Sequence, residues 1–278
     1  MLSPGTAGSA RHSGTMQHRA GRAAHRWLHF RDVILVLVGR DYKGRYKNTA
    51  LGFAWSVISP LLFLLTFYFI FKLVIDLGIP RYATFVFSGV IAWTWFSTSL
   101  SQAVLSIPAH PNLVGQPGFP VAALPIVAVT SNLINFMISL PLLLVILAIE
   151  GSAPTPALLI GLPLLVATQF VLTLSVAYVV AAINVTFRDT QFILPIILQL
   201  GYYVTPIFYD VSRVPRDYRP IFDLNPMVAI ITAYRNLLMH GILPDWTMLA
   251  GVFAASILLL VLGYRYFQRA SHRFLEEL

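Results

Sequence analysis

The chain has 278 residues, of which 57% are hydrophobic and only 11% are charged, and its mean hydropathy is +0.75. Soluble domains carry about a quarter charged residues, so this composition excludes an ordinary soluble domain and predicts an integral membrane protein. The absence of cysteine excludes disulfides, thiol catalysis and cysteine-held metal centres. A net charge of +8 would suggest nucleic acid in a soluble protein, but in a membrane protein it more often reflects topology and anionic headgroups. We therefore expect membrane lipids as partners and no nucleic acid.

Residues 1–26 are rich in Gly, Ala, Ser, His and Arg, and no acidic residue precedes Asp32. They lack the apolar core of a secretory signal, and an organellar transit peptide would share their composition. We predict a disordered cytoplasmic tail, with the membrane domain in residues 27–278. The segment Trp27–Val38 mixes aromatic and aliphatic side chains with charged ones and is too short to span a bilayer. It predicts an amphipathic helix that lies in the membrane interface.

A basic cluster follows this segment, with Arg40, Lys43, Arg45 and Lys47 against a single acid, Asp41. Such a cluster before an apolar segment is typical of a topology signal that also binds lipid headgroups. Arginine forks also suit phosphate oxygens, so the same charges are candidates for binding the phosphate or diphosphate of a substrate. The two interpretations are compatible.

Six apolar segments follow, each close to or above the roughly 20 residues that a spanning helix needs. They cover residues 50–71, 82–107, 121–149, 157–187, 192–209 and 246–264. The sequence therefore predicts an all-α integral membrane protein with six transmembrane helices. With the N-terminus inside, thirteen Lys and Arg lie on the cytoplasmic side and five on the other, which favours both termini in the cytoplasm.

The connection 210–245 is long, contains four prolines and separates the fifth and sixth apolar segments. Within it, apolar residues of Met227–Leu238 recur at helical intervals. The run is too short to span, so we expect one or two short re-entrant or interfacial helices at the outer face.

Several activities are excluded by what the apolar segments lack. Segments 121–149, 157–187 and 192–209 contain no Asp, Glu, His, Lys or Arg, whereas ion-coupled carriers and intramembrane proteases need such groups inside the bilayer. No lysine follows a glycine, so the chain has no phosphate-binding loop for ATP. We expect no catalytic residue, metal site or cofactor in this chain. Any ATP and Mg²⁺ would be bound by a partner subunit.

Aromatic residues form two groups along the chain. Such residues gather at membrane interfaces, but flat rings with hydroxyl groups also suit a pathway along which sugars slide. The candidates for this pathway are Tyr68, Trp93, Trp95, Phe96, Tyr202, Tyr203, Phe208 and Tyr209. The loop 106–120, by contrast, has four prolines and no Lys or Arg, which suggests a contact with another protein.

The basic cluster and the start of the first apolar segment resemble the amino-terminal signature of polysaccharide ABC exporter permeases. The matching residues are Arg40-Asp41-Tyr42-Lys43-Gly44-Arg45-Tyr46-Lys47, Leu51-Gly52, Trp55 and Pro60-Leu61-Leu62. Three later segments resemble the same family in the same order: Phe187-Arg188-Asp189, Thr205-Pro206-Ile207-Phe208-Tyr209, and Leu224-Asn225-Pro226-Met227 with Tyr234-Arg235. These permeases export O-antigen, teichoic acid and related lipid-linked glycans.

The resemblance implies a homodimer of this chain that carries two copies of a separate ABC ATPase subunit. It implies ATPase contacts at Asn112, Leu113, Phe119, Arg188 and Asp189, and an outer-face gate at Asn225, Pro226, Tyr234 and Arg235. Family members usually have basic residues after the Asn-Leu pair, whereas here Val114-Gly115-Gln116 follows.

The leading hypothesis is a multi-pass permease of the bacterial cytoplasmic (inner) membrane that exports a lipid-diphosphate-linked glycan. An ABC exporter of a small lipid or drug is a second hypothesis, and a membrane assembly subunit without transport is a third.

Overall fold

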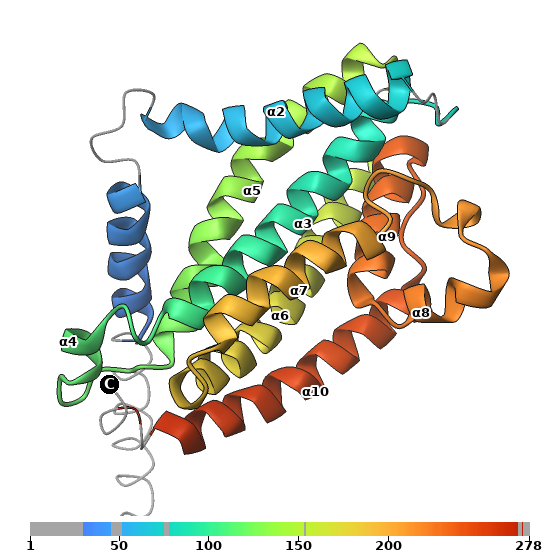
Figure 1. Ribbon diagram of the computed structural model, residues 1–278. Helices are drawn as coiled ribbons and strands as arrows, with labels where there is room; N and C mark the ends of the chain where they lie inside the picture. The colour runs from blue at the N-terminus through green and yellow to red at the C-terminus, as the bar shows by residue number, and fades with distance from the viewer. Residues whose placement is uncertain (1–29, 46–51, 75–77, 153, 272–273, 275–278) are drawn as a thin grey trace, which may run out of the picture.

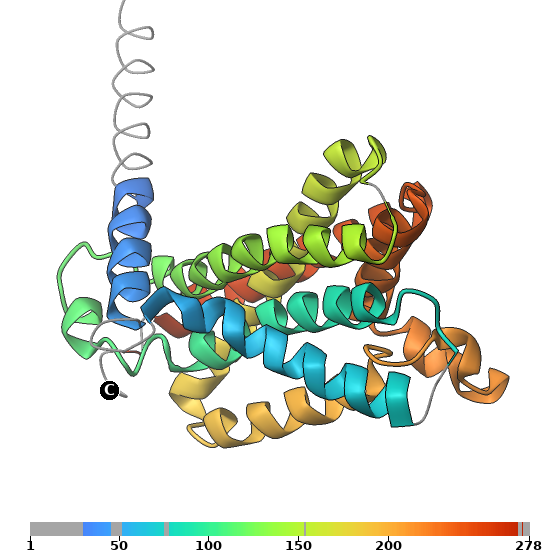
Figure 2. The same ribbon diagram turned by 90° about the horizontal axis from the view of Figure 1, so that it is seen from above.

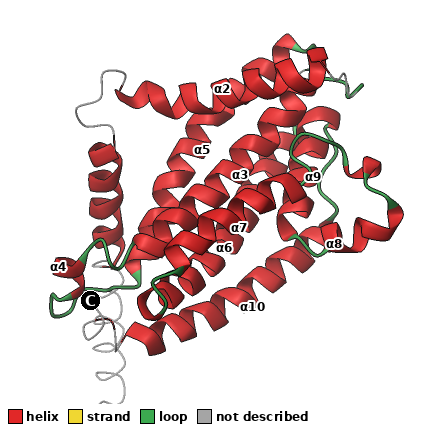
Figure 3. Cartoon of the chain, in the orientation of Figure 1, coloured by secondary structure: helices red, strands yellow, loops and turns green. Residues whose placement is uncertain are grey.

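The computed structural model describes residues 30–45, 52–74, 78–152, 154–271 and 274, and the regular structure in these ranges is helical, with no strand (Figures 1 and 3). The predicted tail, the start of the interface helix at residues 27–29 and Lys47 lie outside them. Residues 30–45 form an N-terminal helix that continues from the predicted interface segment into the basic cluster. The long helices that follow are α2 (Trp55–Tyr68), α3 (Tyr82–Leu105), α5 (Ala123–Ile149), α6 (Ala157–Thr186), α7 (Thr190–Val204), α9 (Pro226–His240) and α10 (Trp246–Ser271). Helix α2 is extended at its two ends by η1 (Gly52–Ala54) and η2 (Phe69–Val74). The short helices are α4 (Pro111–Val114), η3 (Val211–Arg213), η4 (Arg216–Tyr218) and α8 (Arg219–Asp223).

Five segments of the described chain are long and apolar enough to cross a membrane. They are Val57–Val74, Tyr82–Leu105, Ala123–Ile149, Ala157–Thr186 and Trp246–Ser271. The remaining predicted segment contains α7, which has 15 residues and is therefore about 22 Å long, against about 30 Å of hydrocarbon. The prediction of an all-helical membrane protein is confirmed, and the sixth crossing stays a prediction.

Helix α3 lies at the centre of the bundle and contacts α2, α5, α6, α7 and α9 (Figure 1). Its side chains take part in two hydrophobic clusters. One cluster joins the first half of α3, around Phe87 and Ile91, to α9 and the middle of α5. The other joins the last turns of α3, around Leu100 and Val104, to the start of α5, the end of α6 and Phe267 of α10.

Polar side chains from neighbouring elements fix both ends of α3. At the start, the Glu150 carboxylate accepts hydrogen bonds from the backbone N–H groups of Ala83 (3.1 Å) and Thr84 (3.0 Å), which have no partner within the helix. At the end, the Asn184 amide donates to the carbonyl of Val104 (2.8 Å) and accepts from the N–H of Gln191 (3.1 Å). The central helix is thereby joined to α5 at one end and to α6 and α7 at the other.

Segments predicted to share a side of the membrane gather at the same end of the bundle. The N-terminal helix and α4 lie at one end, and α8 lies at the other, in both views of the molecule (Figures 1 and 2). We call these the α4 end and the α8 end. The prediction that the α4 end faces the cytoplasm rests on the distribution of Lys and Arg.

The helix predicted within the connection 210–245 is confirmed as α9. Its start follows from local sequence, because the Asn225 side chain accepts from the N–H of Met227 (3.0 Å) and Pro226 occupies the first helical turn. Its end falls at Gly241, whose φ of 65° is readily adopted only by glycine. Whether α9 is re-entrant or interfacial stays a prediction.

Close packing of α10 on α6 should depend on Gly263. A Cβ added there would lie 3.0 Å from the Ser175 carbonyl and 2.9 Å from Val179 Cγ2, whereas one added to Gly251 of the same helix meets nothing within 4 Å. We expect Gly263→Ala to destabilise the protein by about 1–3 kcal/mol, because a backbone carbonyl cannot move aside. Thermal unfolding in detergent measures this. Gly251→Ala is the matched control, and equal melting temperatures for the two variants would contradict the prediction.

Candidate functional site

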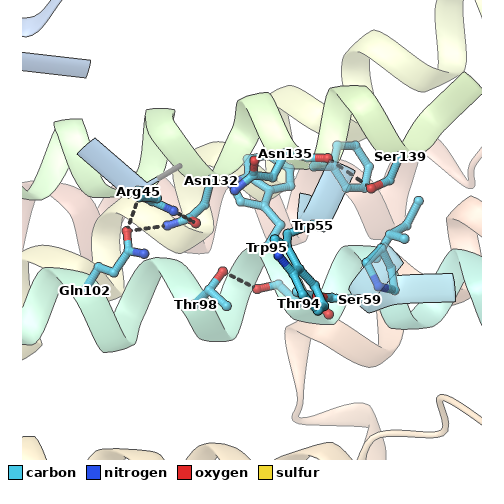
Figure 4. A pocket seen from close by; sticks show the side chains of 13 residues that line it. Arg45, Trp55, Ser59, Thr94, Trp95, Thr98, Gln102, Asn132, Asn135 and Ser139 are labelled. Atoms are coloured by element: carbon cyan, nitrogen blue, oxygen red, sulfur yellow. Dashed lines mark hydrogen bonds between the residues drawn. The ribbon is translucent and has the colours of Figure 1, made fainter. Parts of the chain in front are cut away.

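Arg45, the last described residue of the N-terminal helix, connects that helix to α3 and α5. Its Nε and Nη2 donate to Asp41 Oδ2 (3.1 and 2.6 Å), one helical turn earlier. Its Nη2 also donates to Gln102 Oε1 on α3 (2.6 Å), and Nη1 donates to Asn132 Oδ1 on α5 (2.9 Å; Figure 4). We call these four residues the Arg45 junction.

The Arg45 junction satisfies the groups that it takes out of water. The Asn132 amide donates to Gln102 Oε1 (2.8 Å) and to the Ala128 carbonyl (2.8 Å), so both amides are oriented by more than one bond. The side chains of Arg45 and Asp41 keep 20% and 39% of their exposure. A charge that is half removed from water needs such partners, because an unpaired one is costly in an apolar environment. Arg45 belongs to a basic cluster in the sequence, whereas in the structure it is paired with Asp41.

One cavity of about 490 Å³ lies beside the junction at the α4 end, and we call it the basic cavity. It is formed by the N-terminal helix, the last turns of α3 and the start of α5. Its basic residues are Arg40, Arg45 and His110, with Asp41 as the acid. The His110 ring is positioned by a 2.9 Å contact between Nδ1 and the Ser106 carbonyl. Of the four predicted phosphate-binding candidates, Arg40 and Arg45 line this cavity, Lys43 is exposed outside its lining, and Lys47 is not described.

His110 was missed by the sequence analysis because no spacing along the chain connects it with Arg40. It lies between Pro108 and Pro111 in the loop 106–120, which contains no Lys or Arg. The neighbourhood arises only when the N-terminal helix packs beside that loop.

A second cavity, of about 310 Å³, lies on the other side of the Arg45 junction between α2, α3 and α5 (Figure 4). We call it the polar cavity. It shares Arg45, Gln102 and Asn132 with the junction. The rest of its lining is made of hydroxyl, amide and aromatic side chains: Trp55, Ser59, Thr94, Trp95, Thr98, Asn135, Phe136 and Ser139, with Pro60 and Ile91.

Most of the predicted glycan-pathway aromatics come together on a different face of α3, between α2 and α7. Trp93 contacts Phe96 (5.5 Å between ring centroids) and Tyr202 (6.2 Å). The cluster continues from Tyr202 through Phe208 and Tyr203 to Tyr209, and Phe67 of α2 stacks on Phe208 at 5.6 Å.

Two of the predicted aromatics lie apart from this cluster. Tyr68 packs on Tyr82 (6.5 Å) near the start of α3. Trp95 faces α5, where its Nε1 donates to the Val129 carbonyl (3.3 Å) and its ring lies 5.0 Å from Phe136. Trp95 therefore belongs to the lining of the polar cavity.

The predicted ATPase contacts lie at the α4 end. Asn112 and Leu113 are in α4, and the exposed pair Arg188 and Asp189 forms the turn between α6 and α7. The Asn184 bond to Val104 holds this turn beside the end of α3. Phe119 packs against the hydrophobic cluster at the same end. Contact with an ATPase stays a prediction for these residues.

The predicted outer-face gate residues are held by buried contacts. Arg235 is 6% exposed and donates to the carbonyls of Phe85 (3.2 Å), Pro206 (2.7 Å) and Ile207 (2.6 Å), with its guanidinium 3.5 Å from the centre of the Phe85 ring. This approach needs the glycine at position 89, since a Cβ there would lie 3.1 Å from Arg235 Nη2.

Two other predicted gate residues, Tyr234 and Asn225, also contact neighbouring helices or segments. Tyr234 is buried beside Phe136 (5.9 Å), and the Asn225 amide donates to Thr205 Oγ1 (2.9 Å). Asn225 and Arg235 thus join α9, which begins at Pro226, to the segment after α7.

The charges of Arg235 and Asp210 stabilise each other without a direct ion pair. Burial lowers the pKa of Arg235 to about 9, and the negative charge of Asp210 partly offsets this by raising it. The guanidinium therefore stays charged at neutral pH. Burial acts to raise the pKa of Asp210, but hydrogen bonds from Ser212 and the charges of Arg235 and Arg213 outweigh it, and the pKa is lowered. Both groups are charged at pH 7.

The five long apolar helices of the described chain define a multi-pass membrane protein. The family model described as ABC-2 type transporter matches residues 32–239, and the chain belongs to this family as a permease. The chain is 35% identical over 251 residues to an O-antigen export system permease protein RfbA of Myxococcus xanthus, covering 90% of this chain and 96% of the relative. It is 32% identical over 247 residues to an RfbA of Klebsiella pneumoniae (89% and 95% covered), and 23% identical over 227 residues to the polysialic acid transport protein KpsM of Escherichia coli (81% and 88%).

Replacing Arg235 by lysine should destabilise the bundle although the charge is kept. A lysine ammonium cannot reproduce the planar fork that reaches Phe85, Pro206 and Ile207, so buried carbonyls lose their donors. Each such loss costs about 1–3 kcal/mol, and we expect a clearly lower melting temperature in detergent. Arg216→Lys, at an exposed position, is the control. Unchanged stability of Arg235→Lys would show that the three hydrogen bonds contribute little.

Proposed function

We propose that the chain is the permease subunit of an ATP-driven exporter that moves a lipid-diphosphate-linked polysaccharide across the bacterial cytoplasmic membrane. It would act as a homodimer with two copies of an ABC ATPase subunit and with both termini in the cytoplasm. Two permeases named for O-antigen export are at least 32% identical to this chain over nine-tenths of their length, which supports a substrate of this class.

The single structural observation that favours this substrate is the basic cavity at the end of the bundle that we predict to be cytoplasmic. A lipid diphosphate would bring its anionic group to the membrane interface, where Arg40 and His110 line the cavity and Arg45 closes its inner side. Arg45 is already paired with Asp41, so its charge is largely compensated. Arg40 then supplies the uncompensated charge of the cavity.

The aromatic cluster between α2 and α7 is the proposed path of the sugars. Tyr203 is 54% exposed, its neighbours Phe96, Tyr202, Phe208 and Tyr209 are half-buried, and Trp93 is buried. Ring faces bind the C–H faces of sugars without fixing one position, which suits a chain that must slide. In a homodimer, a second copy would cover the apolar faces that α2 and α7 expose.

The predicted ATPase contacts are α4 and the turn at Arg188. They lie close to the end of α3, which contributes Gln102 to the junction. ATP-driven motion of the partner would therefore act on an element that borders both cavities. The partner subunits would bind ATP and Mg²⁺.

Co-purification from native membranes tests the partner. We expect an ATPase with a phosphate-binding loop to elute with this chain, and glycan export to require ATP. A chain that elutes alone, together with normal surface glycan in a deletion strain, would contradict the transport role.

Arg40→Gln should reduce export more than Lys43→Gln. Both changes remove one positive charge from the same helix, but only Arg40 lines the basic cavity. Since a hydrogen bond to a charged group contributes about 1.5–3 kcal/mol, we expect about ten- to a hundred-fold weaker substrate binding for Arg40→Gln. Surface glycan is measured against the amount of permease in the membrane. If both variants lose export to the same extent, and only because less permease is inserted in the membrane, the basic cluster has a purely topological role.

A further inference from the structure

The polar cavity is separated from the proposed sugar path, because it lies on the α5 side of α3 and not on the α7 side. Its volume of about 310 Å³ falls at the lower end of the range for small-molecule sites, about 300–1,000 Å³. Neither the proposed phosphate site nor the aromatic cluster between α2 and α7 uses it.

The lining of the polar cavity is suited to an uncharged ligand. Arg45 is the one ionisable acid or base among the described residues of its lining, and that charge is paired with Asp41 at 2.6 Å. No Asp, Glu or Lys from the described part of the chain lines the cavity, so a second charge would meet no counter-ion among these residues. A free phosphate is better matched by the neighbouring basic cavity, where Arg40 adds a positive charge.

The hydroxyl groups of the polar cavity favour a ligand that itself carries O–H groups. The Thr98 hydroxyl donates to the Thr94 carbonyl and the Ser139 hydroxyl donates to the Asn135 carbonyl, so each oxygen keeps lone pairs that can accept. Ser59 and Thr94 add two more hydroxyls from α2 and α3. A polyol can donate to several of these oxygens at once.

One indole ring supplies an accessible apolar surface in the same cavity. Trp55 keeps 43% of its exposure and lines the cavity from α2. Trp95 also lines the cavity but is 1% exposed, since its ring packs on Phe136 (5.0 Å) and its N–H donates to the Val129 carbonyl. A flat aromatic surface in the same cavity as several hydroxyl acceptors fits a pyranose, which has an apolar C–H face and hydroxyls around its edge.

We propose that the polar cavity binds one uncharged pyranose of the substrate, the sugar nearest the carrier phosphate. The inference rests on the proposed function, because the two cavities meet at Arg45 and Gln102, so a diphosphate in one places its first sugar toward the other. The Arg45 junction then separates the subsite for the phosphate from the subsite for the sugar. The site would let the permease distinguish a carrier that bears a glycan from a bare carrier.

The test measures binding to the full-length chain in lipid nanodiscs by isothermal titration calorimetry. The probes are a short-chain alkyl diphosphate, the same compound carrying one neutral hexose, and an alkyl alcohol of equal length. The principal variant is Thr94→Val with Thr98→Val, which keeps the side-chain shape and removes two hydroxyls. Ser139→Ala removes a third hydroxyl separately, in case the double variant is unstable. The control is Thr66→Val on α2, whose exposed hydroxyl donates to the Leu62 carbonyl.

We expect the hexose-bearing diphosphate to bind about ten-fold more tightly than the sugar-free one, since two or three hydrogen bonds are added. The double variant and Ser139→Ala should remove most of this gain and leave the sugar-free affinity unchanged. Thr66→Val should keep the gain, and Arg40→Gln should weaken both diphosphates.

Equal affinity for the two diphosphates would overturn the sugar subsite and leave the proposed function intact. A loss of the same size for both diphosphates in the double variant would also overturn it. Diphosphates that bind no better than the alkyl alcohol would overturn the proposed phosphate site together with the inference.

Discussion

The arrangement of this end of the protein depends on one guanidinium group. Arg45 is the only described residue of the N-terminal helix that forms side-chain hydrogen bonds to both α3 and α5, and it does so while its charge is balanced by Asp41 one turn earlier. Breaking one of these bonds in an apolar environment would leave a polar group unpaired, which costs free energy. The junction therefore fixes the position of the N-terminal helix and forms a wall of each cavity.

The second constraint is the central position of α3, whose sides serve different purposes. Towards α7 it presents Trp93 to the aromatic cluster, and towards α5 it presents Trp95 and Gln102 to the polar cavity and the junction. Its ends are fixed by Glu150 and Asn184 from other helices. The interior of the described chain thus uses amides and hydroxyls for specificity and keeps full charges for the ends, with Arg235 as the buried exception.

The sequence sufficed for the helical class and for the position of most long helices, because segments of about 20 apolar residues have few other structures available. It also located α9 through the helical spacing of its apolar residues, while the Asn225-Pro226 start and Gly241 set its bounds in the structure. The length of α7 was overestimated: residues Phe192–Tyr209 are all apolar or weakly polar, but the helix ends at Val204, just before Thr205-Pro206. A proline disfavours helical conformation in the residue before it, and here that local effect prevailed.

The site was predicted less completely, because its parts meet only in three dimensions. Trp93 and Trp95 look alike in the sequence, but two residues in a helix differ by about 200° in direction, so they reach different surfaces. The polar residues of α3 are spread along the helix and do not indicate which face each tryptophan occupies. Asn132 and His110 are isolated polar residues in the sequence, and their place in the site follows from packing of segments that are up to 87 residues apart. Nothing in the sequence connects Glu150 with the start of α3, where its carboxylate accepts two backbone hydrogen bonds.

The bond between Asn184 and the Val104 carbonyl has a mechanical consequence. Asn184 holds the first turn of α7 through Gln191, and Val104 lies only two residues beyond Gln102 on a continuous helix. A helix is stiff along its axis, so force applied to the short α6–α7 connection is not dissipated in a loop. It is transmitted along α3 to the amide of Gln102, which lines both cavities.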